Sequence, residues 1–332
     1  MGTTAAAGAG TTLTKDRLAE AYRVMRTIRA FEERLHVEYR TGEIPGAVHL
    51  YAGQEAIAAG VCAHLGTTDY VGSTHRGHGH AIAKGSDTTA MMLEVYGRAG
   101  GLCGGKGGSM HIADPQRGLL GANGIAAGGV PMVCGAGLSA RLRGTGQVAV
   151  AFLGDGAANQ GAFLESLNLA AVWQLPVVFV VEDNGYAQAT GTAYHLRGIE
   201  VAERARAFGI PARTVDGTDY FAVHDAAAEA VGRARTGGGP TLLEARAMRF
   251  FGHMEGWDEQ GYRAEDEVDR LRRTQDCLTR FTDRVRTEDL LPAAELARID
   301  EAVLAEIDAA VAAARAAEPP AASELTTDVY TV

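Results

Sequence analysis

Two uninterrupted apolar runs stand at the centre of the chain, from Val148 to Leu153 and from Val177 to Val181. Both are rich in β-branched residues, a pattern typical of strands that are covered on both faces of a parallel sheet. The segment between them, AFLESLNLAAVWQL, has its apolar residues at helical spacing. Strand, glycine turn, helix and strand therefore predict one right-handed crossover unit.

Apolar residues at helical spacing also mark both ends of the chain. A helix is predicted to start after Thr14 and to end near Gly42. Beyond the central crossover the pattern predicts further helices and strands at 200–208, 212–217, 221–235 and 241–250. Two amphipathic segments close the chain and are interpreted as core-packing helices: one carries Leu271, Leu278, Phe281 and Val285, the other Leu296, Ile299, Val303, Ile307 and Val311.

These elements predict a single α/β domain over residues 13–318. Its sheet is expected to be mostly parallel and flanked by helices on both faces, with helical N- and C-terminal extensions. Residues 1–12 form a tail of small residues that is expected to be flexible, and 319–332 form a C-terminal tail. Glycine clusters fill residues 46–146, which indicates either backbone wrapped closely around a ligand or partner, or low-complexity coil. Interleaved His, Arg and Met residues favour the first interpretation.

Composition narrows the possible partners and the compartment. The chain has 332 residues, 46% of them hydrophobic, and a net charge of −10, which argues against nucleic acid or an anionic membrane surface as a partner. Its four cysteines lack CxxC spacing and are expected to be reduced. Neither a signal peptide nor an apolar run of about 18 residues is present, so a cytoplasmic protein is expected.

Polar side chains follow each of the two central strands. Asp155 lies in GDG after the first run, and Asn184 lies in EDNGYAQ after the second, 29 residues later. Parallel strands end at the same edge of a sheet, where open α/β sheets bind ligands. One carboxylate, one amide and a glycine turn with outward N–H groups suit a Mg²⁺ ion that holds a diphosphate. The alternative is structural: Asp155 only forms a turn and Asn184 only caps one.

GDG followed about thirty residues later by Asn resembles the thiamine-diphosphate motif. From roughly Leu13 to Glu318 the chain is similar to the α subunit of 2-oxo acid dehydrogenase E1 components, which have a thiamine-diphosphate-binding fold. Two of the segments that carry the resemblance, STHRGHGH and GSMHIAD, look more like acetoin dehydrogenase than the mitochondrial pyruvate enzyme. In family order these segments are HLYAGQEA, STHRGHGHAIAKG, GLCGGKGGSMHIAD, GANGI, GDGAANQGAFLESLNLAAVWQLPVVFVVEDNGYA and GHMEGW.

The resemblance implies a set of site residues. Thiamine diphosphate and Mg²⁺ are the expected cofactors, and the metal ligands would be Asp155, Asn184 and the backbone carbonyl of Tyr186. His75 and Arg76 would bind the diphosphate. The residues that the resemblance assigns to cofactor binding are His75, Arg76, Gly124, Ile125, Ala126, Gly154, Asp155, Gly156, Ala157, Asn184 and His253.

Two positions depart from the family pattern. Asp183 stands where the family has a first Asn, and its carboxylate is expected to point away from the diphosphate or to recruit a compensating cation. Ala126 replaces a branched residue that supports the bent coenzyme, so Ile125 or a partner chain would provide the support, or the coenzyme would be held less tightly.

Histidines are the candidate catalytic residues at the reacting carbon. By resemblance His49 lies at the substrate entrance, and His253 lies on a loop, RFFGHMEGWDEQG, that closes over the cofactor. This loop has Met254 and no serine, so control by phosphorylation is expected to be absent. A competing interpretation treats His75, His78 and His80 as a zinc site.

The resemblance also implies partners. The coenzyme needs a Glu that belongs to the β subunit in this family, so the chain is expected to work as half of an active site in an α2β2 heterotetramer. It would cleave a small 2-oxo acid or α-hydroxyketone and transfer the acyl unit to the lipoyl group of an E2 acyltransferase. The alternatives are a carboligase subunit in a biosynthetic pathway and a non-catalytic assembly subunit. A dinucleotide-binding Rossmann protein is disfavoured, since no GxGxxG opens a helix after a strand.

Overall fold

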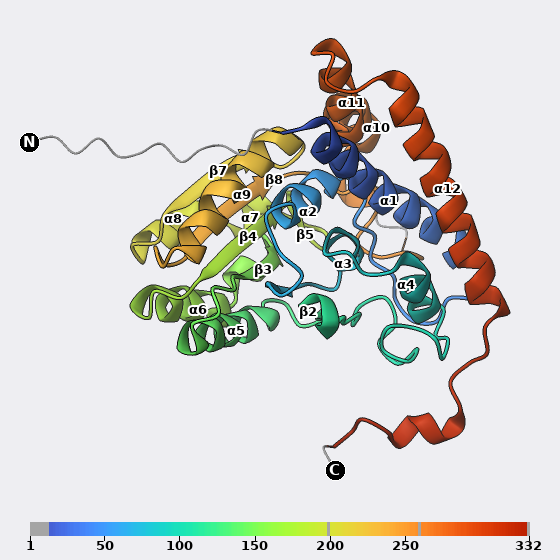
Figure 1. Cartoon of the computed structure of the whole chain (residues 1–332), viewed down its shortest axis with the longest axis horizontal. Helices are drawn as coiled ribbons and strands as arrows, with labels where there is room; N and C mark the ends of the chain where they lie inside the picture. Colours follow the sequence, from blue (N-terminus) through green and yellow to red (C-terminus); the bar gives the residue numbers. More distant parts are fainter. Residues whose placement is uncertain (1–12, 198–199, 258–259, 331–332) are drawn as a thin grey trace, which may run out of the picture.

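One parallel sheet forms the centre of the molecule (Figure 1). The computed structural model describes residues 13–197, 200–257 and 260–330. The six strands lie in the order β2-β1-β3-β4-β8-β7, and every neighbouring pair is parallel. Their bounds are β1 Tyr70–Gly72, β2 Leu119–Gly121, β3 Ala149–Gly154, β4 Val177–Asp183, β7 Ala212–Asp216 and β8 Thr241–Arg246. The predicted parallel α/β sheet is confirmed.

Alternate residues of the central strands enter two different hydrophobic cores. On β3, Val150 and Phe152 belong to a core that includes residues of α1 (Lys15–Tyr39), α2 (Glu55–Cys62), α9 (Tyr220–Arg235) and α12 (Ala293–Ala316). Ala151 and Leu153 face the other way and belong to a core built with α5 (Gly129–Arg143), α6 (Gly161–Val172) and α8 (Val201–Ala207). Both faces of β3 are therefore buried, which explains why its sequence is a continuous apolar run.

Helices cover both faces of the sheet (Figure 1). Further helices precede the first strand and follow the last strand in the chain. Thr14 begins the first helix, because its side chain accepts a hydrogen bond of 3.3 Å from the backbone N–H of Arg17. The helices are α1 Lys15–Tyr39, α2 Glu55–Cys62, α3 His78–Ala83, α4 Thr88–Val95, α5 Gly129–Arg143, α6 Gly161–Val172, α7 Thr192–His195, α8 Val201–Ala207, α9 Tyr220–Arg235, α10 Glu267–Gln275, α11 Cys277–Thr287 and α12 Ala293–Ala316. None of the helices in these described ranges is long and apolar enough to cross a membrane.

Long helix α12 packs along α1 and α4, as Figure 1 shows. All five of its predicted core residues are buried. A hydrogen bond of 2.9 Å from the Tyr22 hydroxyl to Asp300 joins α1 to α12. After α12 the chain continues to a short 3-10 helix at Ala322–Thr326. The predicted flexible tail at 1–12 lies outside the described residues.

Two predicted elements have different bounds in the structure. Strand β8 ends at Arg246 rather than near residue 250, because the following chain leaves the sheet and the N–H of Phe250 donates to the carbonyl of Ala52 at 3.0 Å. The first closing segment is two helices, not one. Asp276 separates them, and its side chain accepts from the N–H of Leu278 at 3.3 Å to cap α11.

The glycine-rich stretch is ordered around one carboxylate. Glu94 on α4 is fully buried, and its oxygens accept four backbone N–H groups of the loop that follows. The donors are Cys103 at 2.7 Å, Gly105 at 2.8 Å, Gly107 at 2.7 Å and Gly108 at 3.0 Å. Such a loop is a specific structure, so the interpretation as low-complexity coil is wrong here.

The register of β3 and β4 decides which residues meet at the carboxyl edge of the sheet. Leu153 pairs with Val181 and Gly154 pairs with Glu182. One step further along, Asp155 and Asp183 leave the two strands at the same level. The order in which strands are added to the sheet reverses next to this point, since β2 lies on one side of β1 and β3 on the other. Such a switch point is where doubly wound sheets bind ligands.

Candidate functional site

A cavity of about 320 Å³ lies at this edge of the sheet. It is bordered by the turns that follow β1, β3 and β4 and by the loops that carry Ile125 and His253. Eleven of the sequence-predicted site residues line it: His75, Arg76, Ile125, Ala126, Gly154, Asp155, Gly156, Ala157, Asn184, Tyr186 and His253. The other two, His49 and Gly124, are not among the lining residues. The structure thus brings nearly the whole predicted set to one place.

Asp155 is the first residue after β3 in the chain and is only 2% exposed. Burial, together with the nearby Asp183 carboxylate, holds the pKa of Asp155 above its usual range, and His195 opposes this shift. The His195 Nε2 atom lies 3.1 Å from Asp155 Oδ2, and the Thr192 hydroxyl donates to the same oxygen at 3.4 Å. A buried carboxylate with a raised pKa is one that a bound cation would stabilise in its charged form.

Asn184 is held by a neighbouring amide. Its Nδ2 donates to Gln54 Oε1 at 3.2 Å, which fixes the direction of the side chain. Its Oδ1 atom is buried and has no hydrogen-bond partner among the described residues. A buried acceptor without a partner costs free energy unless a cation or a water fills the place. The donor set of one carboxylate oxygen and one free amide oxygen therefore fits a hard divalent cation such as Mg²⁺.

Tyr186 begins a small antiparallel ribbon of β5 Tyr186–Ala187 and β6 Thr190–Gly191. The turn after β3 packs closely on this ribbon, since a Cβ added at Gly156 would lie 2.5 Å from the Cβ of Ala187. The glycine is thus required for the two segments that border the predicted metal site to approach each other.

The unusual Asp183 is tied back to its own turn. Its Oδ1 accepts the N–H of Gly185 at 3.1 Å, and it is not among the residues that line the cavity. Its charge nevertheless raises the pKa of Asp155, so the two carboxylates are within electrostatic reach of each other. The extra negative charge is turned away from the cavity but still acts on it.

Arg76 joins two segments that are distant in sequence. Its guanidinium donates to the carbonyl of Leu50 and, at 3.0 Å, to the carbonyl of His253. Burial and the neighbouring Arg249 lower the pKa of Arg76 to about 9, so it stays charged near neutral pH. The prediction from sequence gave Arg76 only a phosphate-binding role, whereas the structure also gives it this clamping role.

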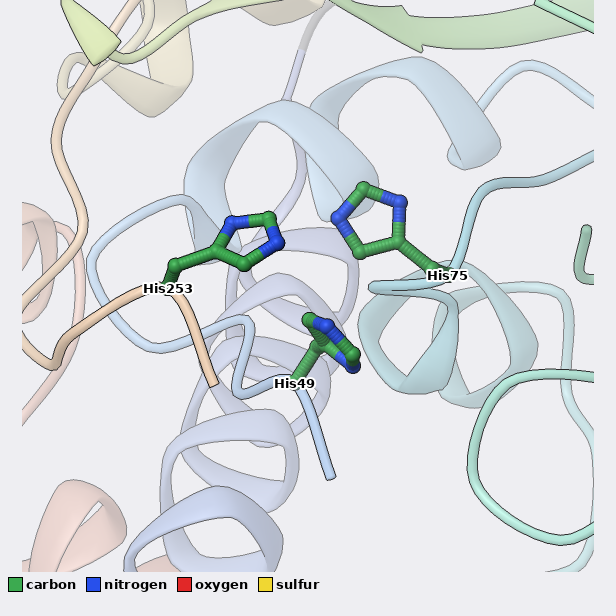
Figure 2. A group of neighbouring side chains, drawn as sticks. All are labelled: His49, His75 and His253. Atoms are coloured by element: carbon green, nitrogen blue, oxygen red, sulfur yellow. The ribbon is translucent and has the colours of Figure 1, made fainter. Parts of the chain in front are cut away.

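Three histidines meet beside the cavity, but they are not the three of the competing zinc interpretation. His49, His75 and His253 come together from three different segments (Figure 2). His78 instead lies 3.0 Å from Glu32 and 3.0 Å from the Ser109 hydroxyl, so both of its ring nitrogens have partners. The zinc interpretation that linked His75 with His78 and His80 is therefore wrong.

His80 belongs to a buried network under the cavity. Its Nε2 is 3.0 Å from Glu182, its Nδ1 is 2.7 Å from the Ser73 hydroxyl, and its ring stacks on Phe152 with 3.8 Å between centroids. The Tyr51 hydroxyl donates to the same Glu182 oxygen. Ser73, Phe152 and Glu182 all line the cavity, so this network forms its floor.

Ala126, which stands where the family has a branched residue, is exposed and lines the cavity. Ile125, which also lines it, is 74% exposed. The next residue, Ala127, has a φ of 60° in the left-handed region, which few non-glycine residues adopt. The exposed apolar side chain of Ile125 at the rim is available to a ligand or to another chain.

The sequence prediction gave no site role to several residues that act here, among them Gln54, Glu182 and Arg249 in the cavity lining and His195 beside Asp155. Glu182 and Gln54 stood inside the quoted segments that carry the family resemblance, so a signal was present. Arg249 opens the loop RFFGHMEGWDEQG that is predicted to close over the cofactor, so a signal was present for it too. His195 had none, because it reaches the site only through the three-dimensional path of the chain.

The fold and this site define a class. A profile of the dehydrogenase E1 component family matches residues 23–323, and the chain belongs to this family. The family depends on thiamine diphosphate, so the predicted thiamine-diphosphate-binding fold and the oxidoreductase class are confirmed.

Particular relatives make the comparison closer. The alpha subunit of acetoin:2,6-dichlorophenolindophenol oxidoreductase from Cupriavidus necator is 56% identical over 318 residues, which cover 96% of this chain and 95% of that protein. The subunit of the same name from Bacillus subtilis is 50% identical, over 97% of this chain and 96% of its own length. The pyruvate dehydrogenase E1 component subunit alpha of Zymomonas mobilis is 40% identical, over 95% and 89%. These names confirm the α-subunit type and imply a β-subunit partner.

The floor of the cavity gives a test of the site's architecture. Tyr51→Phe removes the hydroxyl that donates to the buried Glu182 carboxylate, and the expected loss in the free energy of unfolding is about 1.5–3 kcal/mol. Tyr194→Phe is the matched control, because Tyr194 is 90% exposed, and it should change stability by less than about 0.5 kcal/mol. Urea denaturation measures both, and equal effects of the two substitutions would contradict the assigned network.

Proposed function

We propose that this chain is the α subunit of an enzyme that cleaves acetoin or a closely related α-hydroxyketone and passes the acyl unit to a lipoyl carrier. Two acetoin-type relatives at 56% and 50% identity, against 40% for the pyruvate-type relative, support this substrate class. The observation that carries the catalytic part is the buried Oδ1 of Asn184, which no described residue satisfies and which lies at the same sheet edge as Asp155.

Mg²⁺ is the cation that these oxygens suit best. Asp155 offers a carboxylate oxygen, Asn184 an amide oxygen and Tyr186 its backbone carbonyl, all at the border of the cavity. Mg²⁺ takes few protein ligands and completes its six oxygens with water and phosphate. Gln54 contributes by holding the Asn184 amide so that its oxygen, not its nitrogen, remains available.

Thiamine diphosphate, when bound, supplies the carbon nucleophile and the electron sink that acyl cleavage needs. The residues of this chain bind and orient it. The guanidinium groups of Arg76 and Arg249 would face the diphosphate and offset its charge, and the cavity histidines would offer hydrogen-bond donors to it. Exposed Ile125 at the rim would support the coenzyme in place of the branched residue that Ala126 lacks.

His49 and His253 would move protons at the reacting end. Burial and Arg76 lower the pKa of His49 to about 3, and burial and Arg76 lower that of His253 to about 4. Both rings are therefore neutral at pH 7 and can accept a proton. An anionic ligand would raise both pKa values towards the range that favours general acid–base catalysis.

The site is completed by other chains. The acid that activates the coenzyme would come from the β subunit, so the working unit is an α2β2 heterotetramer, and an E2 acyltransferase would accept the product. Exposed apolar residues at the cavity rim support this view, because they leave one side of the pocket uncovered. We also propose a cytoplasmic location, which four unpaired cysteines support.

Removing the metal ligand tests the cation site. Asp155→Ala should abolish magnesium-dependent binding of thiamine diphosphate to the α/β complex, because the two remaining protein oxygens, those of Asn184 and Tyr186, carry no charge to hold Mg²⁺. Circular dichroism should stay unchanged. Asp183→Asn is the matched control. It keeps the acceptor for the Gly185 N–H and should change the dissociation constant of thiamine diphosphate by less than about threefold. Calorimetry measures both, and tight binding by Asp155→Ala would refute the assignment.

Removing one histidine tests the proton-transfer role. His253→Ala should lower kcat of the reconstituted complex by about 10²-fold or more, the usual contribution of a general acid or base. The dissociation constant of the coenzyme should change far less. Steady-state kinetics and calorimetry on the same preparation separate the two effects. Unchanged turnover would remove His253 from the proposed mechanism.

A substrate screen tests the function itself. The purified chain alone should show no turnover, because the β subunit holds the missing acid. The α/β pair should reduce an artificial electron acceptor with acetoin at a higher kcat/KM than with pyruvate or branched 2-oxo acids. Activity of the isolated chain would contradict the divided site, and a preference for pyruvate would contradict the substrate class.

A further inference from the structure

The loop after β8 carries His253 to the cavity, and one charged side chain of this loop is buried. Within residues 251–257, Met254 is partly exposed and Trp257 is 50% exposed. Glu255 is different, because its side chain is only 8% exposed. A carboxylate that a surface loop buries needs partners that offset its lost hydration. The partners of Glu255 therefore show where the loop is attached.

Glu255 binds the last turn of α1. The Nδ1 atom of His36 lies 2.9 Å from Glu255 Oε2, and Arg40 lies 2.9 Å from the other ring nitrogen, His36 Nε2. Arginine has donors and no acceptor, so Nε2 of His36 accepts and the ring proton is on Nδ1. His36 therefore donates a hydrogen bond from Nδ1 to the Glu255 carboxylate.

His36 also contacts the loop on the other side of His253. Its ring lies against Phe251 with 4.4 Å between the centroids. One residue of α1 thus touches the loop two residues before His253 and two residues after it. The turn that follows also packs on α1, since Gly256 has a φ of 79° and a Cβ added there would lie 3.2 Å from the ring of Tyr39. The short segment that carries His253 is therefore held at both of its ends.

A backbone contact joins this attachment to the second proposed catalytic histidine. The N–H of Glu255 donates to the carbonyl of Val48 at 2.9 Å, directly before His49 in the chain. The rings of His49 and His253 lie 4.9 Å apart. The residue that binds α1 through its side chain thus holds these two rings near each other through its backbone.

We propose that His36 and Glu255 are positioning residues, which attach the loop 251–257 to α1 and thereby hold His253 at the cavity. Neither residue is among those that line the cavity, so each acts through the loop. This inference rests on the proton-transfer role proposed for His253. It adds the support for that ring: a helix of 25 residues that packs along α12.

The charges around the pair explain why the donor on His36 matters. Burial raises the pKa of the Glu255 carboxyl, His36 and Arg40 oppose this shift, and Glu32 adds to it. The loop thus keeps an acid in a place where its charge is unfavourable, and the hydrogen bond from His36 offsets part of that loss. Without this donor the carboxylate is better hydrated in water, which favours release of the loop.

Fluorescence of the loop tests the attachment in the full chain. The chain has two tryptophans, so Trp173→Phe leaves Trp257 of the loop as the only one. In that background His36→Phe keeps a ring against Phe251 and removes the donor to Glu255. The constant for quenching by acrylamide should rise by about 1.5- to 2-fold, because half of Trp257 is already exposed and local release exposes the rest.

Three further variants separate attachment from a general loss of stability. His36→Asn places an N–H donor where histidine has Nδ1 and should return the quenching constant to within about 20% of the unsubstituted value. His64→Phe is the matched control, because His64 also donates from one ring nitrogen, but to the carbonyl of His224 on α9 at 2.9 Å, and the constant should not change. Glu255→Leu should match His36→Phe, and the double variant should add little, because either substitution breaks the pair.

Kinetics of the reconstituted α/β complex test the effect on His253. His36→Phe should lower kcat by about tenfold or more, since a shift of about 1 Å in a catalytic group has effects of at least this size. The dissociation constant of the coenzyme should change by less than about threefold, because the residues that line the cavity are intact. His36→Asn should recover most of kcat.

The results that would overturn the proposal are distinct from those that concern the proposed function. An unchanged quenching constant in both His36→Phe and Glu255→Leu, with circular dichroism retained, would overturn it, as would an equal rise in His64→Phe. A raised constant with unchanged kcat would also overturn it, because the loop would then be attached without positioning His253. An unsubstituted complex that does not turn over acetoin would count against the proposed function alone, since the quenching comparison needs no turnover.

Discussion

The parallel pairing of β3 with β4 is the constraint on which the site depends. Its register sets Gly154 level with Glu182, so Asp155 and, two residues after Glu182, Asn184 both lie at the same edge of the sheet. Each strand is buried on both faces, so a shift of one residue would move apolar side chains between the two cores. The hydrophobic cores thus hold two polar side chains in fixed positions that those side chains could not maintain alone.

Around this edge the chain adds charges that offset one another. Asp155 and Asp183 bring negative charge to the site. Arg76 and Arg249 bring positive charge, and His195 lies against the Asp155 carboxylate. Arg76 has a second effect, since its hydrogen bonds to the carbonyls of Leu50 and His253 tie the segment before α2 to the loop after β8. Electrostatics and the shape of the cavity are therefore coupled through one side chain.

Much of the sheet, and the meeting of Asp155 and Asn184 at its carboxyl edge, could be predicted from the sequence, because buried parallel strands and their glycine turns leave a strong local pattern. The division of the first closing segment at Asp276 could not, since capping by a single side chain leaves the apolar spacing almost unchanged. The competing zinc interpretation of the histidines fails for a related reason. His75, His78 and His80 are close in sequence, but the short helix α3 turns His78 and His80 towards Glu32 and Glu182. The role of His195 depends on long-range folding, which no local pattern records.

Anomalous diffraction from a crystal of the α/β complex with Mn²⁺ and thiamine diphosphate tests the central claim most directly. The account predicts one strong manganese peak within about 2.0–2.3 Å of an Asp155 carboxylate oxygen and of Asn184 Oδ1, with the diphosphate on its open side. A peak on Asp183 or elsewhere, or a bound diphosphate with no metal between these two residues, would contradict it.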